Sequence, residues 1–149
     1  MTATVTLAAE RVRIPSALQF MDHQAEAIHA FHAGATRAIW RWHRQAGKGL
    51  GALGWTGTAA FQRPGTYMIS SPTSSLGNEN YWDAIDPDTG QRYIALVFPP
   101  QLVLDTNENE KAMVIATAEA GKTSRIIFRS ADDPDRLRTA MVRDGSEWK

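Results

Sequence analysis

The chain has 149 residues, of which 43% are hydrophobic and 21% are charged. This balance is typical of one globular domain and excludes a disordered polymer. The absence of cysteine excludes a disulfide framework and a thiolate metal site. The formal net charge is zero, so a nucleic-acid partner would need a local basic patch. No apolar run reaches the length of roughly 18 residues that a membrane-spanning helix requires.

Residues 1–13 are expected to form an irregular lead-in, and residues 14–149 are expected to form one domain. The domain opens with a predicted helix that starts at Ala17 or Asp22 and ends at His32. Because its apolar positions recur every three to four residues, one face of this helix is expected to pack against the rest of the domain.

This first helix carries Phe20 and Gln24 on one face, and two interpretations of that pair stay open. In the first, both residues belong to an ordinary packing helix. In the second, the Phe20 ring stacks on an adenine, and the Gln24 amide donates to and accepts from the edge of the base.

The stretch that follows is the most informative one in the chain. Residues 37–42 read as a buried central strand, the first of a parallel sheet, and they lead into a turn that ends in Gly47 and Lys48. A strand, a Gly-Lys turn and then a helix are the layout of a phosphate-binding loop. Gly47 would let the backbone approach an anion, and Lys48 would reach the outer phosphates. The alternative is a solvated turn.

A helix is predicted for residues 48–61, although it has glycines at positions 49, 51, 54 and 57. Each glycine costs about 1 kcal/mol of helix stability relative to alanine. Close packing of the helix on the sheet would account for them, and so would a mobile helix.

A second strand is predicted for residues 66–70, followed by a helix capped by Ser74 or Ser75. That helix would carry Tyr81, Trp82 and Ile85. Residues 86–90 have the composition of a turn, and an extended connector is expected to begin at Phe98.

Two apolar runs, residues 112–118 and 124–128, predict a β-hairpin. The turn between them contains a second Gly-Lys pair, at Gly121 and Lys122. We reject this pair as a nucleotide site, because strand-forming residues follow it and leave no helix N-terminus to hold an anion.

The histidines and tryptophans give weaker signals. His29 and His32 share a helix face, but no third ligand is near them in the sequence, so no metal site is predicted. Three tryptophans are expected in the core around the central strand, namely Trp40, Trp42 and Trp55. Two are expected to be partly exposed, namely Trp82 and Trp148.

Four stretches, in this order, resemble the N-terminal ATPase domain of the large terminase subunit of tailed bacteriophages, the motor that packages DNA. They are similar in turn to that family's adenine-binding element, its variant phosphate loop, the segment after its second strand, and the stretch ahead of its acidic strand motif. The stretches are the helix with Phe20, His23 and Gln24, the loop at residues 40–48, the Ser-Pro-Thr segment at residues 71–73, and residues 128–138.

The resemblance implies an α/β fold of the P-loop NTPase type, with a mostly parallel sheet and flanking helices, here incomplete. It implies that Lys48 binds the β- and γ-phosphates of ATP and that Arg44 lies near the γ-phosphate, where it would stabilise developing charge. Phe20 and Gln24 would hold adenine. The other nucleotide-binding residues would be Gln45, Ala46, Gly47 and Gly49.

The resemblance also implies partners and a location. ATP would bind with Mg²⁺, and the intact motor would move double-stranded DNA. A portal protein, the small terminase subunit and further copies of the chain would be partners, in the cytoplasm of the bacterial host and away from any membrane.

Several positions depart from the family pattern. Gly49 replaces the Ser or Thr that holds magnesium, and Thr139 replaces a glycine. The acidic strand motif is not clear, although Glu147 falls at about the right distance to be the catalytic carboxylate, with Ser146 in the magnesium position. No nuclease domain follows. The chain is therefore expected to be a truncated domain that binds nucleotide weakly and hydrolyses it poorly.

Two alternatives are kept. One is a non-enzymatic, terminase-like fragment that acts through protein or DNA contacts. The other is a helicase-like P-loop ATPase. A truncated sheet would also expose an edge strand, which predicts self-association through that edge.

Overall fold

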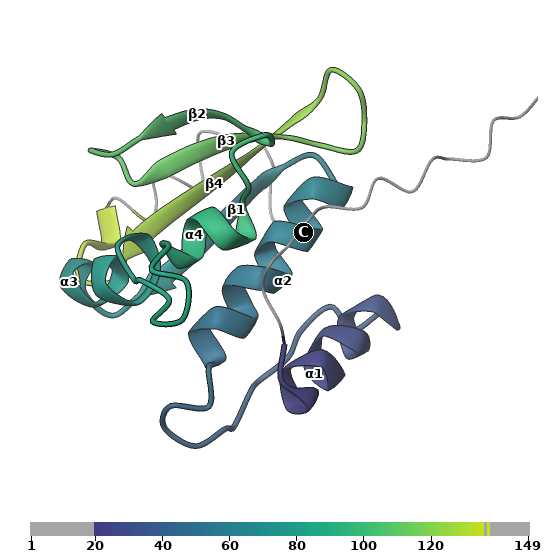
Figure 1. The fold of residues 1–149 in the computed structure, drawn as a ribbon, viewed down its shortest axis with the longest axis vertical. Helices are drawn as coiled ribbons and strands as arrows, with labels where there is room; N and C mark the ends of the chain where they lie inside the picture. Colours follow the sequence, from purple (N-terminus) through teal and green to yellow (C-terminus); the bar gives the residue numbers. More distant parts are fainter. Residues whose placement is uncertain (1–19, 136, 138–149) are drawn as a thin grey trace, which may run out of the picture.

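The computed structural model describes residues 20–135 and 137. A four-stranded sheet forms one layer, and helices α2 (Lys48–Gln62) and α4 (Tyr93–Val97) lie against it, with α1 (Asp22–His32) beyond α2 (Figure 1). The α/β prediction with flanking helices is confirmed. No helix among the described residues is long and apolar enough to cross a membrane.

The sheet has the strand order β1-β4-β3-β2. β1 (Thr66–Ser71) is parallel to β4 (Thr123–Ser130), whereas β3 (Ala112–Ala116) is antiparallel both to β4 and to β2 (Val103–Asn107). The expectation of a mostly parallel sheet is therefore wrong for the described residues. The reason is local, because the short turns that join β2 to β3 and β3 to β4 permit only antiparallel pairing.

The core lies between the sheet and the helices. Ile69 of β1 is paired in register with Phe128 of β4, and Met113 of β3 with Ile126 of β4. These side chains form one buried cluster with residues of α2, α4 and the adjoining segments, namely Leu53, Ala60, Trp82, Ile94, Val97, Phe98 and Ile115. The predicted hairpin and the strand at residues 66–70 are confirmed.

The predicted central strand at residues 37–42 is wrong. This segment is extended but pairs with no described strand, and Ile39 is 89% exposed. Its aromatic side chains pack against each other and against α1: Trp40 stacks on Trp42 at 4.9 Å between ring centroids, and the Trp42 ring meets the edge of His23 at 4.7 Å. The rings therefore gain their burial from helices and not from a sheet.

The predictions for Trp55 and Trp82 also need correction. Trp55 is half-buried and stacks on Phe31 of α1 at 4.8 Å, so it does not surround a central strand. Trp82, expected to be partly exposed, is 0% exposed. Trp148 lies outside the described residues.

Helix α2 occupies nearly the predicted range, and at least one of its glycines has a packing reason. A Cβ at Gly57 would lie 2.6 Å from Cγ1 of Val97 in α4. The glycine therefore lets α4 approach α2 more closely than any larger residue would permit. The close-packing interpretation holds at this position.

The segment after β1 differs in detail from its prediction. Thr73 caps the short helix α3 (Ser74–Gly77), one residue before the predicted Ser74 or Ser75, and its hydroxyl accepts from the Leu76 amide at 3.3 Å. A π-helical turn, η1 (Asn78–Trp82), follows directly and ends before Ile85. Sequence reasoning also missed α4 and β2.

Candidate functional site

The candidate site is the loop that joins the extended segment to α2. Gly47 is the N-cap of α2 with φ 69°, and Gln45 has φ 66°. A Cβ at Gly47 would lie 2.4 Å from Nε2 of Gln24. Both the left-handed backbone and the close approach of Gln24 therefore favour glycine at position 47. Gln45 adopts the same region with a side chain, which is a strained conformation.

Helix α1 holds this loop from the protein side. The Gln24 side chain is 1% exposed; its Nε2 donates to the Gly47 carbonyl at 2.9 Å, and its Oε1 accepts from the Met21 amide at 2.9 Å. His23 donates from Nε2 to the Ala46 carbonyl at 3.0 Å. Two consecutive loop carbonyls are thus fixed by two consecutive side chains of α1.

These contacts bear on the predicted adenine element. Phe20 is half-buried at the start of the described chain, close in sequence to Gln24. The Gln24 amide already makes two hydrogen bonds inside the protein. A base would therefore have only its second N–H and the remaining lone pair of its oxygen to use.

Lys48 is the first residue of α2, and its ammonium group lies over the loop. Nζ donates to the Trp42 carbonyl at 2.9 Å and to the His43 carbonyl at 2.8 Å, and the side chain is exposed. The first backbone N–H groups of a helix have no partner within the helix. The loop therefore gathers one full positive charge and several unpaired donors at the same end of α2, where the helix dipole also favours an anion.

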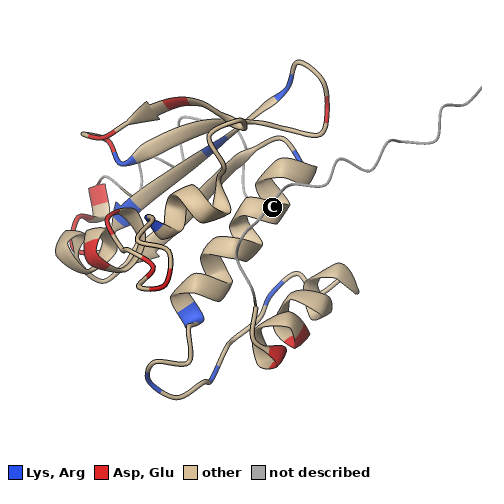
Figure 2. Ribbon diagram, viewed as in Figure 1, with Lys and Arg blue, Asp and Glu red and all other residues tan. Residues whose placement is uncertain are grey.

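The surrounding chain adds to this positive field. No carboxylate occurs between Glu26 and Glu79 in the sequence. Figure 2 accordingly shows basic but no acidic residues along the loop, α2 and β1. Five cations lie in this acid-free stretch, namely Arg37, Arg41, Arg44, Lys48 and Arg63. Arg44 is exposed within the loop itself, so it can turn toward a bound anion.

The donors present at the loop fit a phosphate. Gly49 offers no hydroxyl, and the described residues contain no group of three or more His, Cys, Asp or Glu that would hold a metal. Glu147 and Ser146, the predicted carboxylate and magnesium positions, lie outside the described residues, as does Thr139. Their roles stay predictions.

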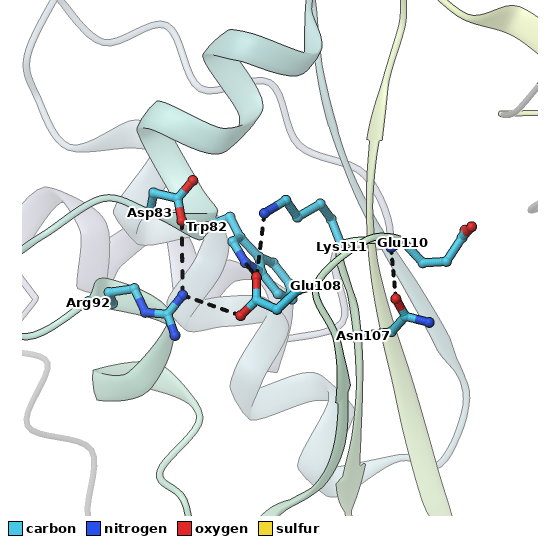
Figure 3. Close-up of polar contacts among 7 residues, drawn as sticks. All are labelled: Trp82, Asp83, Arg92, Asn107, Glu108, Glu110 and Lys111. Carbon is cyan, nitrogen blue, oxygen red and sulfur yellow. Dashed lines mark hydrogen bonds and ion pairs between the residues drawn. The ribbon is translucent and has the colours of Figure 1, made fainter.

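A second feature near the loop was not visible in the sequence. η1 is fixed by a cluster around Glu108, shown in Figure 3: Glu108 accepts from Nε1 of the buried Trp82 at 2.5 Å and pairs with Lys111 at 3.5 Å and Arg92 at 3.6 Å. The Trp82 hydrogen bond and the two cations hold the pKa of the Glu108 carboxyl below its ordinary value. The Lys111 ammonium also lies 5.2 Å from the Trp82 ring centroid.

A cavity of about 560 Å³ opens beside η1 at the carboxyl ends of the parallel strands β1 and β4. Tyr81 lines it together with polar residues of β4 and the following turn, among them Arg129, Ser130 and Asp132. Arg129 is already paired with Glu110 at 3.2 Å. The polar residues that end each of these two strands, Ser71 and Ser130, were the available signal for this cavity.

Comparisons with protein-family models, with curated proteins and with solved structures found no match. The geometry brings together Gln24, Gln45, Gly47 and Lys48, all named from the sequence. Tyr81, which contacts Gly49, was not named as a site residue.

Proposed function

We propose that this chain is the ATP-binding part of a DNA-packaging terminase motor of a tailed bacteriophage. In the intact protein, ATP hydrolysis would drive the translocation of double-stranded DNA. This would take place in the host cytoplasm, with the portal protein, the small terminase subunit and further copies of the chain as partners. The observation that carries the proposal is the Lys48 ammonium, held at the N-terminus of α2 by the Trp42 and His43 carbonyls.

Phosphate binding by this loop would require only that the Lys48 ammonium exchange its hydrogen-bond acceptors. The Lys48 ammonium would leave two neutral carbonyls and pair with charged phosphate oxygens, which form shorter and stronger hydrogen bonds. The first amides of α2 would donate to the same phosphate. Arg44 would supply a second positive charge from the solvent side. Gln24 and His23 would keep the loop carbonyls in place during the exchange.

Magnesium, when bound with ATP, would screen phosphate charge, but Gly49 has no hydroxyl to hold it at the loop. The proposal is therefore limited to nucleotide binding with little hydrolysis by this chain alone. Magnesium-dependent turnover at the rate of an intact motor would contradict that limit.

The test is calorimetric titration of ATP, with and without magnesium, into the unmodified chain and into Lys48→Ala. We expect binding that is lost in Lys48→Ala. Arg63→Ala is the matched control, because Arg63 belongs to the same acid-free stretch but lies at the opposite end of α2. Equal affinity of the unmodified chain and Lys48→Ala, or no binding by either, would refute the proposal.

The glycine at position 49 favours a second candidate, a non-enzymatic terminase-like fragment that acts through contacts with DNA, portal or intact subunits. Under this candidate the loop has a structural role and binds no nucleotide. Lys48→Ala would then leave every measurable activity unchanged.

A further inference from the structure

The Tyr81 ring lies tightly against the space that a side chain at position 49 would need. A Cβ built on Gly49 lies 3.1 Å from Cε1 of Tyr81 and 3.5 Å from the Tyr81 hydroxyl oxygen. Gly49 is the second residue of α2, directly after Lys48. The phenol of Tyr81 therefore lies at the first turn of α2, beside Gly49.

The π-helical turn η1 explains how Tyr81 reaches this position. η1 closes with a hydrogen bond from the Asp83 amide to the Asn78 carbonyl at 2.8 Å, a wider turn than that of an α-helix. Trp82 points into the core, where Glu108 fixes its indole (Figure 3). The preceding residue, Tyr81, is thereby left on the α2 side. π-helical turns often occur at functional sites.

The start of η1 is also held by contacts with the sheet. A Cβ at Gly77 would lie 2.5 Å from Oγ of Ser71, so the start of η1 is in close contact with the end of β1. The Tyr81 ring also lies 6.3 Å from the Phe128 ring of β4. The phenol is thus positioned by the sheet and not only by its own backbone.

The chemistry of the Tyr81 hydroxyl suits a phosphate oxygen. Partial burial raises its pKa, so the oxygen keeps its proton at neutral pH and can donate. Its hydroxyl makes no hydrogen bond to any other residue in the described part of the chain. Tyr81 also lines the cavity at the carboxyl ends of β1 and β4, on whose lining Gly47, Lys48 and Gly49 do not lie.

We propose that the Tyr81 hydroxyl, which lies beside Gly49, donates a hydrogen bond to a phosphate oxygen of the nucleotide held at Lys48. The inference rests on the proposed function, since it needs a phosphate at this loop. A neutral donor reaches a phosphate oxygen directly, so this contact requires no metal ion. Nucleotide binding should therefore depend on Tyr81 even when magnesium is absent.

The experiment compares the unmodified chain with Tyr81→Phe by calorimetric titration of ATP and of pyrophosphate in the absence of magnesium. We expect about a tenfold loss of affinity for both probes, the effect of removing one hydrogen bond to a charged group. Tyr93→Phe is the matched control, because Tyr93 starts α4 and does not line the cavity, and it should bind like the unmodified chain.

The outcomes separate the two proposals. If Lys48→Ala loses binding while Tyr81→Phe retains the full affinity, the proposed Tyr81 contact is refuted, and nucleotide binding at the Lys48 loop is still supported. If the unmodified chain binds neither probe, the nucleotide site fails and the Tyr81 contact fails with it. Circular dichroism and a thermal melt of each variant show that the fold is kept.

A second set of variants returns a hydroxyl to α2 itself. Tyr81→Ala should bind as weakly as Tyr81→Phe, and adding Gly49→Ser to it should recover affinity, because the ring that blocks position 49 is gone. Gly49→Ser alone should weaken binding, since its Cβ would meet the Tyr81 ring at 3.1 Å. Failure of the double variant to bind better than Tyr81→Ala would count against a shared hydroxyl position.

Discussion

The sheet side and the loop side of this molecule are held together by different kinds of contact. On the sheet side, Trp82 and Ile126 are completely buried, at 0% exposure. On the loop side, Trp40 and Trp42 are half-buried, stack on each other and make edge contacts with rings of α1. Regions with fewer buried apolar contacts open at lower free energy than the core. The loop is therefore expected to open at a lower free energy than the sheet.

The largest expected effect is on the free energy of unfolding, and it compares a tryptophan of the sheet side with a tryptophan of the loop side. Trp82→Ala should lower the free energy of unfolding by about 3–5 kcal/mol, the range for large-to-small changes in a core. Trp40→Ala should lower it by only about 1 kcal/mol, as is usual for a partly exposed site. Urea unfolding followed by far-ultraviolet circular dichroism measures both. Equal losses would mean that the two sides form one cooperative unit of uniform packing.

A medium effect compares two glycines of α2 that face opposite sides. Gly57→Ala should destabilise the protein by about 1 kcal/mol, because overpacking against Val97 outweighs the helix-propensity gain. A Cβ at Gly51 would lie 3.4 Å from the Trp40 ring and 3.6 Å from Cγ of Gln24, both ordinary contacts. Gly51→Ala should therefore stabilise by up to about 1 kcal/mol. Thermal unfolding of the two variants gives the signs, and the same sign for both would contradict the contrast.

The smallest effect concerns pH and the cluster around Glu108. The pKa of Glu108 is lower in the folded protein than its ordinary value of 4.5. Its contribution to stability is therefore complete above the unfolded-state pKa and is lost as the pH falls through the folded-state pKa. Glu108 is largely exposed, so screening keeps the effect small.

Glu108→Gln keeps an oxygen that accepts from Trp82 but carries no charge. The stability difference between the unmodified chain and this variant should be constant from pH 7 to about 5 and should shrink toward pH 3. Urea midpoints across this range measure it. A difference that grows on acidification would show that the charge of Glu108 is unfavourable in the folded state.

The elements that the sequence predicted are apolar segments bounded by clear turn signals. β3 and β4 are two apolar runs joined by a turn with Gly121 at φ 76°, and no residue of α2 from Gly49 to Phe61 is exposed. α4 was missed because five residues are too short to show a helical period. β2 was missed because only Val103 of its five residues is even half-buried.

The strand prediction for residues 37–42 was wrong for a different reason. Alternating aromatic and charged residues fit a strand as well as they fit an extended segment packed on a helix, and only distant residues such as His23 and Phe31 decide between them. The same limit applies to the candidate site. Gly47 and Lys48 were readable from local spacing, whereas the contact of Gln24 spans 23 residues and that of Tyr81 depends on a π-helical turn.

The stacked pair of Trp40 and Trp42 has a spectroscopic consequence. Their indole planes are only 11° apart at 4.9 Å, close enough for their ultraviolet transitions to couple. The Trp42 carbonyl is also one of the two acceptors that hold the Lys48 ammonium. An anion that draws this ammonium away changes the hydrogen bonding of the Trp42 backbone beside the coupled pair. If the loop binds an anion as proposed, near-ultraviolet circular dichroism should therefore report that binding without any added label.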